Sequence, residues 1–192
     1  MEVFPKENRY IRVTTPLQVF SGLENVPSKI LEYAADRGTR VHKFCEQYAY
    51  SILFSEIDDD CFEYVQAFIN WYDENVDSVV FTEKRLYCDE LKITGCADML
   101  CILKDESYNG KPCLIDIKTS SKPSKTWPLQ TAAYKYLCEK NGYDVQERFI
   151  VHLKKDGKYS CISYGDNSDA SKYQKDLSIY ASVLESYVYF NL

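Results

Sequence analysis

Residues 113–134 read CLIDIKTSSKPSKTWPLQTAAY, and this stretch decides the fold. Its first six residues form a short apolar run that two charged residues, Asp116 and Lys118, interrupt. Because side chains alternate between the two faces of a strand, both charges share a face with Leu114, while the cysteine and the isoleucines point the other way. An ordinary half-exposed strand with a surface ion pair and a catalytic site are both consistent with this pattern.

The same stretch joins a strand to a helix. Pro128 suits the first turn of a helix, and Gly142 lies where such a helix would end. Before it, Asn109-Gly110 is a strong hairpin-turn signal between two strand-like runs. Hydrophobic patterns predict the other elements. The expected strands are 79–88, 93–104, 112–119, 147–154 and 158–164. The expected helices are 28–35, 39–54, one from the acidic triplet 58–60 to about 76, 128–142 and 168–190.

Three features of the first helices leave alternatives open. Ser28 is a plausible N-cap. Gly38 marks either a break between two helices or a place of close backbone approach. The triplet Asp58–Asp60 is best explained as a cap and dipole partner of the following helix, and a metal site is the less favoured interpretation.

The order of the elements predicts the fold class. A helix between the third and fourth strands indicates a sheet that is partly parallel and partly built from hairpins, so we expect an α/β fold with a central mixed β-sheet flanked by α-helices. The length of 192 residues predicts a single domain, 1–192. Its prolines predict that 1–27 is an irregular N-terminal arm, with one short helical turn within 14–23, and 168–190 is expected to be a C-terminal packing helix.

Composition limits the function classes. The formal net charge of −6 excludes a global basic field for nucleic acid, so any such contact requires local basic residues or metal ions. The eight cysteines include no CxxC pair, which favours reduced thiols over disulfides or zinc knuckles. With no apolar run of 18 residues and no signal-peptide pattern, we expect a soluble, cytoplasmic protein without a membrane partner.

One lone carboxylate points to a metal. Asp98 is the only charge between Ile93 and Leu103, and a hairpin through Asn109-Gly110 would bring it near Asp116. Two close carboxylates repel each other unless a cation lies between them, and oxygen ligands suit Mg²⁺ or Mn²⁺. Lys118 would then orient the attacking water or stabilise charge on a phosphate. The alternative is a structural ion pair on the sheet face.

Helical spacing adds further candidates. Gln130 and Tyr134 share one helical face just beyond the charged strand, although a surface glutamine and a core tyrosine would look the same. His42 and Glu46 are also four residues apart, as a metal ligand and its partner can be, or as an ordinary helix would place them. Glu83 opens the first strand, where an exposed ion pair is equally consistent.

Together, the ordered motifs RGTRVH…E, E…L, TGCAD, LIDIKT and LQTAAY resemble the PD-(D/E)xK nuclease superfamily, and specifically its RecB-like, phage-type exonuclease branch. The resemblance covers roughly residues 35–140 and implies a restriction-endonuclease-like core. It also implies roles for residues of this chain. The implied metal ligands are His42, Asp98, Asp116 and the backbone carbonyl of Ile117; the implied catalytic residues are Asp98, Asp116 and Lys118; the supporting or substrate-binding residues are Gln130 and Tyr134, with Glu83 and Glu46 matching more weakly.

Two departures from the family are visible. The proline that names the superfamily is absent before Asp98, where the chain has Cys96-Ala97. Some relatives hold an iron–sulfur cluster through cysteines near the C-terminus, but only Cys138 and Cys161 lie late here, so no cluster is expected.

The resemblance therefore implies a Mg²⁺-dependent DNA exonuclease, with Mn²⁺ as a substitute. Its expected partner is the end of linear DNA, and its expected setting is recombination, repair or phage DNA processing in a bacterial, phage or prophage context. A homo-oligomer and a single-strand-annealing or recombination partner stay open. The alternatives are a structure-specific endonuclease on the same fold and a catalytically inactive nucleic-acid-binding module.

Overall fold

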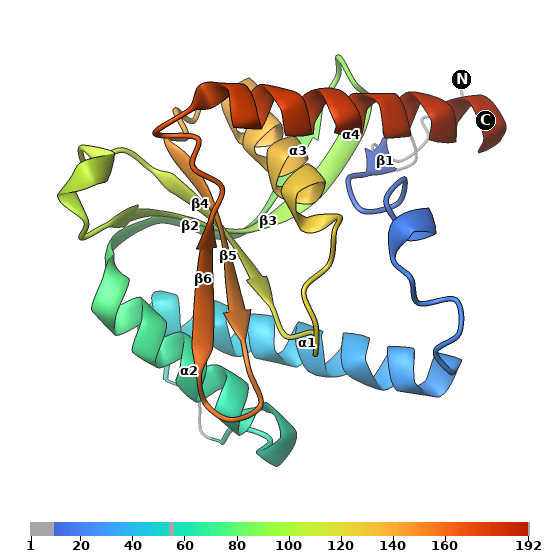
Figure 1. Ribbon diagram of the computed structural model, residues 1–192. Coiled ribbons are helices and arrows are strands. Elements are labelled where there is room, and N and C mark those ends of the chain that lie inside the picture. Colours follow the sequence, from blue (N-terminus) through green and yellow to red (C-terminus); the bar gives the residue numbers. More distant parts are fainter. Residues whose placement is uncertain (1–9, 54–55, 192) are drawn as a thin grey trace, which may run out of the picture.

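The computed structural model describes residues 10–53 and 56–191, and within them one mixed sheet forms the centre (Figure 1). The first nine residues of the predicted arm lie outside the described residues. The sheet order is β1-β3-β4-β5-β6, with β2 also paired to β3. β1 runs parallel to β3 and β4 parallel to β5, while the other neighbours are antiparallel. The strands are β1 Ile11–Arg12, β2 Val76–Cys88, β3 Ile93–Leu103, β4 Cys113–Lys118, β5 Glu147–Leu153 and β6 Tyr159–Ser163.

Two pairs of helices cover the two faces of this sheet (Figure 1). α1 Ser28–Ala49 and α2 Asp59–Asn75 pack on one face, and α3 Trp127–Lys140 and α4 Ala170–Asn191 pack on the other. In the described part of the chain, two 3₁₀ turns, η2 Gln18–Phe20 and η3 Glu106–Tyr108, lie between the longer elements. The predicted fold class, a central mixed sheet flanked by helices, is confirmed.

The alternation predicted for β4 places its two faces in different cores. Ile115 and Ile117 join the apolar cluster under α1 and α2, whereas Leu114 joins the cluster under α3 and α4. All three side chains are at most 3% exposed, and burying such a side chain contributes roughly 1.5–3 kcal/mol. Asp116 therefore belongs to a strand that is buried on both faces, and the picture of a half-exposed strand is wrong for this residue.

The predicted hairpin turn forms where the sequence places it. Asn109 and Gly110 adopt φ angles of 53° and 65°, both in the left-handed region. Glycine and asparagine tolerate this region best, which is why the dipeptide predicts the turn. The turn brings β4 back beside β3, with Met99 opposite Ile115.

The predicted break at Gly38 is wrong, because α1 runs unbroken from Ser28 to Ala49. A close approach, the alternative interpretation, does not exclude a side chain here, since a Cβ on Gly38 would lie 3.4 Å from Oγ1 of Thr119, an ordinary contact distance. Ser28 is the first helical residue rather than the N-cap, which is Pro27. The helix also ends earlier than predicted, since Ser51 has a φ of 55° and leaves the helical region.

The N-terminal arm is more regular than predicted over its described part. Its backbone amides at Ile11 and Val13 donate to the carbonyls of Lys92 and Thr94, which makes β1 an edge strand. Val13 and Leu17 are buried against the α3–α4 side of the sheet. A two-residue strand is too short to show a sequence period, so the pattern could not reveal it. The predicted helical turn within 14–23 is confirmed by η2.

Candidate active site

The site begins where the β3–β4 ladder ends. Met99 and Ile115 are the last paired residues, and the next pair in register would place Asp98 opposite Asp116. Instead of continuing the ladder, Oδ2 of Asp98 accepts a hydrogen bond of 2.7 Å from the backbone amide of Ile117. The predicted approach of the two aspartates is thus produced by the hairpin. The strands part at this point, and polar groups can face one another in the gap.

Glu83 reaches the same gap from the other side of β3. In the β2–β3 register, Thr82 pairs with Met99 and Lys84 with Ala97, which leaves Glu83 across from Asp98. Its backbone has a φ of 44°, a left-handed conformation that costs a residue with a Cβ of the order of 1–3 kcal/mol. Strain of this kind within a strand is retained where the surroundings require it, and here it accompanies a carboxylate aimed into the site.

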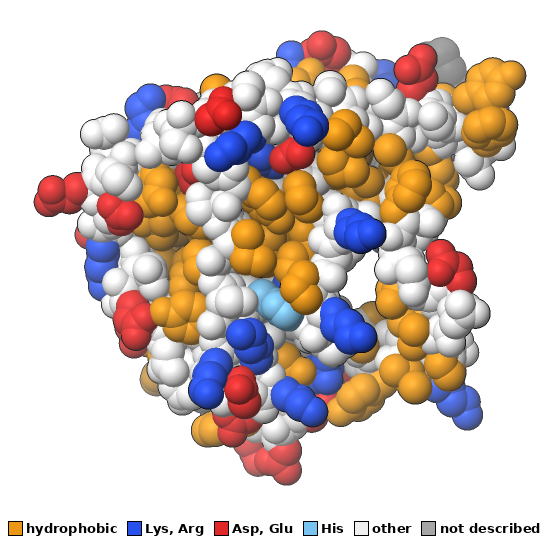
Figure 2. All heavy atoms as spheres, in the orientation of Figure 1, with side chains coloured by type: hydrophobic (Ala, Val, Ile, Leu, Met, Phe, Trp, Pro, Cys, Tyr) orange, Lys and Arg blue, Asp and Glu red, His pale blue; other side chains and the backbone are white. Residues whose placement is uncertain are grey.

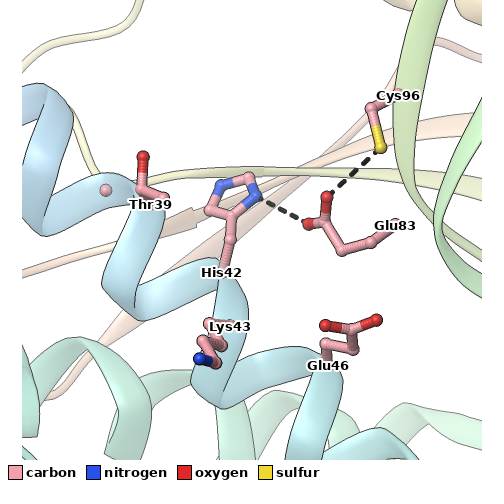
Figure 3. A pocket seen from close by; sticks show the side chains of 7 residues that line it. Thr39, His42, Lys43, Glu46, Glu83 and Cys96 are labelled. Carbon is pink, nitrogen blue, oxygen red and sulfur yellow. Dashed lines mark hydrogen bonds and ion pairs between the residues drawn. The ribbon is translucent and has the colours of Figure 1, made fainter.

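His42 enters the site from α1. Its Nδ1 lies 3.2 Å from Oε1 of Glu83 and 3.6 Å from Oδ1 of Asp98, and its Nε2 lies 3.1 Å from the carbonyl oxygen of Ile117. His42, Glu83 and Asp98 can each offer one atom to a common point, because those atoms lie within 4.8 Å of one another. Figure 3 shows Glu83 between the His42 ring and Cys96, whose thiol donates to the other carboxylate oxygen at 3.4 Å.

The charges of this cluster depend on one another. Burial lowers the pKa of His42, but Asp98 and Glu83 raise it more strongly, and the result is about 9. Burial raises the pKa of Asp98 to about 7, with Asp116 adding to the rise and His42 opposing it. Because both neighbours of the His42 ring nitrogens are acceptors, the ring fits best as a doubly protonated cation. The acidic side chains around this gap, Glu83, Asp98 and Asp116, therefore attract a positive charge.

The donor set fits a divalent cation. Two carboxylates and a backbone carbonyl are oxygen ligands of the kind that Mg²⁺ and Mn²⁺ accept, and His42 adds one imidazole. A metal ion would supply the positive charge that the protonated His42 supplies in its absence. The residues that would hold it are His42, Glu83, Asp98 and the carbonyl of Ile117.

Asp116 and Lys118 form a separate pair beside this cluster. Nζ of Lys118 lies 2.6 Å from Oδ2 of Asp116, and Nε2 of Gln130 donates to Oδ1 at 3.1 Å. The contact with Lys118 has the distance of an ion pair but not the angles of a hydrogen bond, so Oδ2 is buried without a hydrogen-bond donor. Asp116 is not one of the three side chains that meet within 4.8 Å, and its implied role as a metal ligand stays a prediction.

Tyr134 lies under the site rather than at its surface. The side chain is 8% exposed and belongs to the apolar cluster beneath α3 and α4. Its ring occupies the space above Gly95, where an added Cβ would lie 2.4 Å from Cε1. The Gly-x-x-Asp spacing of TGCAD is therefore explained by packing: the glycine admits Tyr134, and Asp98 follows three residues later.

A pocket of about 470 Å³ opens beside the cluster. His42, Glu46 and Glu83 all line it, but among the described residues Glu46 makes no ion pair or hydrogen bond through its carboxylate (Figure 3). Cys96 and Thr39 also line the pocket, and neither was predicted. The strand period could have indicated Cys96, which lies two residues before Asp98.

The acidic triplet is engaged by an arginine. Arg40 lies within 2.9 Å of carboxylate oxygens of Asp36, Asp58 and Asp60. Asp58 is the N-cap residue of α2, and Asp59 and Asp60 lie in its first turn, as predicted for a cap and dipole partner. Asp58 makes no side-chain capping bond, because the Arg40 guanidinium pairs with its carboxylate. Asp58, Asp60 and Cys61 have atoms close enough for a metal, yet Arg40 already supplies their positive charge.

None of the helices in the described part of the chain combines the length and the apolar character that crossing a membrane requires.

Comparisons with known proteins give distant structural likenesses. No protein-family model matches the sequence, and no curated protein matches it significantly. Among solved structures, the protein called SSO0001 is 18% identical with a TM-score of 0.42, over 95% of this chain and 79% of its own. The alkaline exonuclease LHK-Exo from Laribacter hongkongensis is 14% identical with a TM-score of 0.43, over 96% of this chain and 93% of its own. At these values neither likeness decides what this chain does, and its site is interpreted from its own geometry.

Proposed function

We propose that this protein is a metal-dependent nuclease that hydrolyses phosphodiester bonds of DNA. The observation that carries the proposal is the meeting of His42, Glu83 and Asp98 within 4.8 Å, at the point where β3 and β4 part. The pair of Asp116 and Lys118 lies beside this cluster. Phosphodiester hydrolysis requires a charged group near the reacting phosphate, and Lys118 can provide it.

A divalent ion held by His42, Glu83, Asp98 and the Ile117 carbonyl would supply Lewis acidity and lower the pKa of a bound water. The protein's own groups do the rest. Glu83 orients the His42 ring through Nδ1. The 2.6 Å contact with Asp116 holds the Lys118 ammonium at the edge of the site, where it stabilises negative charge on a phosphate or orients the attacking water. Gln130 holds the other oxygen of Asp116 and so fixes that pair.

The finer assignments rest on the resemblance of the motifs to the RecB-like branch of the PD-(D/E)xK superfamily. We infer an exonuclease that uses Mg²⁺ and acts on the ends of linear DNA in recombination, repair or phage DNA processing. All the expected acidic and lysine positions of the motif set are filled in this chain, which favours an active enzyme over an inactive binding module. The net charge of −6 opposes binding to DNA, so a homo-oligomer or a protein partner is part of the proposal.

The test is digestion of linear duplex DNA with Mg²⁺, and with EDTA in place of the metal. Asp98→Asn, Asp116→Ala and Lys118→Ala should each lower the rate by roughly 100-fold or more, the size of effect seen when one electrostatic group is removed from a reacting centre. A matched control is Lys92→Ala, an exposed lysine on the turn before β3. Equal rates in wild type and the three site variants would refute the mechanism.

The same assay separates the alternatives. A covalently closed circular DNA is not a substrate for an enzyme that requires an end, so its cleavage would replace the exonuclease by an endonuclease. Binding of DNA by the wild type without cleavage in Mg²⁺ or Mn²⁺ would identify an inactive binding module.

A further inference from the structure

A second pocket lies nearer the start of α1 than the candidate active site does. It has a volume of about 440 Å³, and its walls come from α1, α2, the loop after β4, and the turn between β5 and β6. Three cations line it, Arg37, Lys154 and Lys155, against one carboxylate, Asp156. That carboxylate is already engaged, because Oδ1 of Asp156 accepts from the backbone amide of Lys158. The pocket therefore carries an excess of positive charge on a chain whose net charge is −6.

Arg37 is the most informative of these cations. Nη2 donates to the carbonyl of Thr119 at 3.3 Å, and the guanidinium lies 4.7 Å from the ring centroid of Tyr64. Nε is buried and has no acceptor, and within residues 10–53 and 56–191 no carboxylate pairs with this side chain. A half-buried charge without a counterion is costly unless a ligand provides one. The Tyr64 ring and the Thr119 carbonyl hold the guanidinium in a position in which it can bind an anion.

The loop after β4 supplies neutral donors beside these charges. Nε2 of His152 donates to the carbonyl of Ser120 at 2.6 Å, which holds the loop against β5. Next to it, the hydroxyl of Ser121 has no partner among the described residues and lines the pocket. Lys154 and Lys155 likewise form no ion pair within the described chain. Guanidinium, ammonium and hydroxyl groups around one hollow are the usual contacts of a phosphate.

The pocket and the candidate active site share two structural elements. On α1, Arg37 precedes His42 by five residues, which is a rise of about 7.5 Å along the helix. The two side chains also contact backbone carbonyls of the same segment, Arg37 that of Thr119 and His42 that of Ile117. On the other element, Ser120 follows Lys118 by two residues, and Thr119 between them contacts Gly38 of α1. One nucleic-acid strand can therefore reach both places.

We propose that this pocket binds a backbone phosphate of the strand whose scissile bond lies at the candidate active site. The inference rests on the proposed nuclease function and adds the contact that holds the substrate strand in place. Figure 2 shows Lys and Arg side chains gathered near the lower ends of β5 and β6, the region to which the turn with Lys154 and Lys155 belongs. A free phosphate has the same chemistry, and the experiment separates the two sources.

The test measures binding of a fluorescein-labelled single-stranded oligonucleotide by anisotropy in EDTA, over a range of salt concentrations. Lys154→Ala/Lys155→Ala should weaken binding several-fold, regardless of base sequence, and should reduce the slope of log K against log salt by about 0.7 for each lysine–phosphate interaction that the double variant removes. Asp156→Asn should act in the opposite direction and tighten binding. In Mg²⁺, the double variant should raise KM while kcat changes less than about twofold, because the pocket lies outside the reacting centre.

The matched control is Lys172→Ala/Lys175→Ala, which removes two exposed lysines from α4 on the other face of the sheet. If the pocket variant has the affinity and salt slope of this control, the pocket proposal is overturned while the nuclease stands. If the wild type binds no oligonucleotide and cuts no DNA, the proposed function itself fails. Calorimetry measures the binding of inorganic phosphate to the same proteins. If the pocket variant loses phosphate binding but binds the oligonucleotide as the wild type does, the pocket binds free phosphate and the proposed strand contact is overturned.

Discussion

In the candidate site, the backbone of Glu83 is strained, and the charged side chains shift one another's pKa values. Glu83 keeps a left-handed backbone within a strand, and that conformation accompanies its contact with His42. A period-two pattern predicts which face of β2 a side chain lies on, but it does not predict a positive φ at a glutamate. The sequence therefore indicated Glu83 only weakly, although the structure gives it the shortest side-chain contact to His42.

His42 offers a direct test of this charge arrangement. In the metal-free protein its pKa should be about 9, because Asp98 and Glu83 stabilise the imidazolium more than burial opposes it. Asp98→Asn removes one negative charge and should lower that pKa. Proton NMR titration in EDTA can measure the pKa of His42 in both proteins, since the chain has only two histidines. The other histidine, His152, lies outside the cluster.

The same shift has a consequence for stability. A histidine whose pKa is raised by folding stabilises the folded state fully below its unfolded value of about 6.5, and the contribution disappears as the pH rises through about 9. Urea unfolding of the metal-free protein should therefore show stability falling between pH 6.5 and 9, less steeply in Asp98→Asn. A wild-type titration near 6.5, with no such slope, would contradict the arrangement.

Two glycines lie where secondary-structure elements pack against other segments, and they differ in the room they leave for a Cβ. Gly95 of β3 lies under Tyr134 of α3, where an added Cβ would be 2.4 Å from the ring, and Gly38 of α1 lies against Thr119, where it would be 3.4 Å from the hydroxyl. Gly95→Ala should destabilise the fold by about 1–3 kcal/mol through overpacking. Gly38→Ala, in a helix interior with ordinary contact distance, should stabilise it by roughly 0.5–1 kcal/mol.

Urea denaturation of the two variants provides the measurement. Combining Gly95→Ala with Tyr134→Ala should cost less than the sum of the two single changes, because the smaller side chain leaves room for the new methyl group. Additive losses would mean that Gly95 is required for a reason other than the ring.

The elements themselves were largely predictable, and their ends were not. The strand-like apolar runs and the Asn109-Gly110 turn predicted the hairpin of β3 and β4, and through it the placement of Asp98 across from Asp116. The break at Gly38 was predicted wrongly because a glycine in a helix interior resembles a helix end in sequence, while α1 in fact continues through it. Contacts between distant segments, such as β1 with β3, leave no periodic signal.

Across the whole molecule, a buried charge network joins elements that no sequence pattern connects. Arg148 of β5 is fully buried and contacts Asp166 through Nε and Nη2, Asp176 of α4 through Nη2, and the carbonyl of Pro128 through Nη1. Pro128 lies in the first turn of α3, two residues before Gln130, which holds Asp116. The network thus links the C-terminal helix to the candidate site through the start of α3.

Breaking this network should unfold the protein more readily and loosen the site. Arg148→Met leaves Asp166 buried without its main partner, which is expected to cost about 3–5 kcal/mol in urea unfolding. Arg148→Met combined with Asp166→Leu removes both charges, so part of that loss should be recovered. The recovery is incomplete because the buried Lys135 loses its 3.3 Å contact with Asp166 and keeps only Glu139, at 4.0 Å. In the double variant α3 loses its hydrogen bond at Pro128, so the rate of DNA cleavage should stay reduced although part of the stability returns. Full recovery of both stability and rate would show that the network supports the fold alone and that Gln130 is positioned without it.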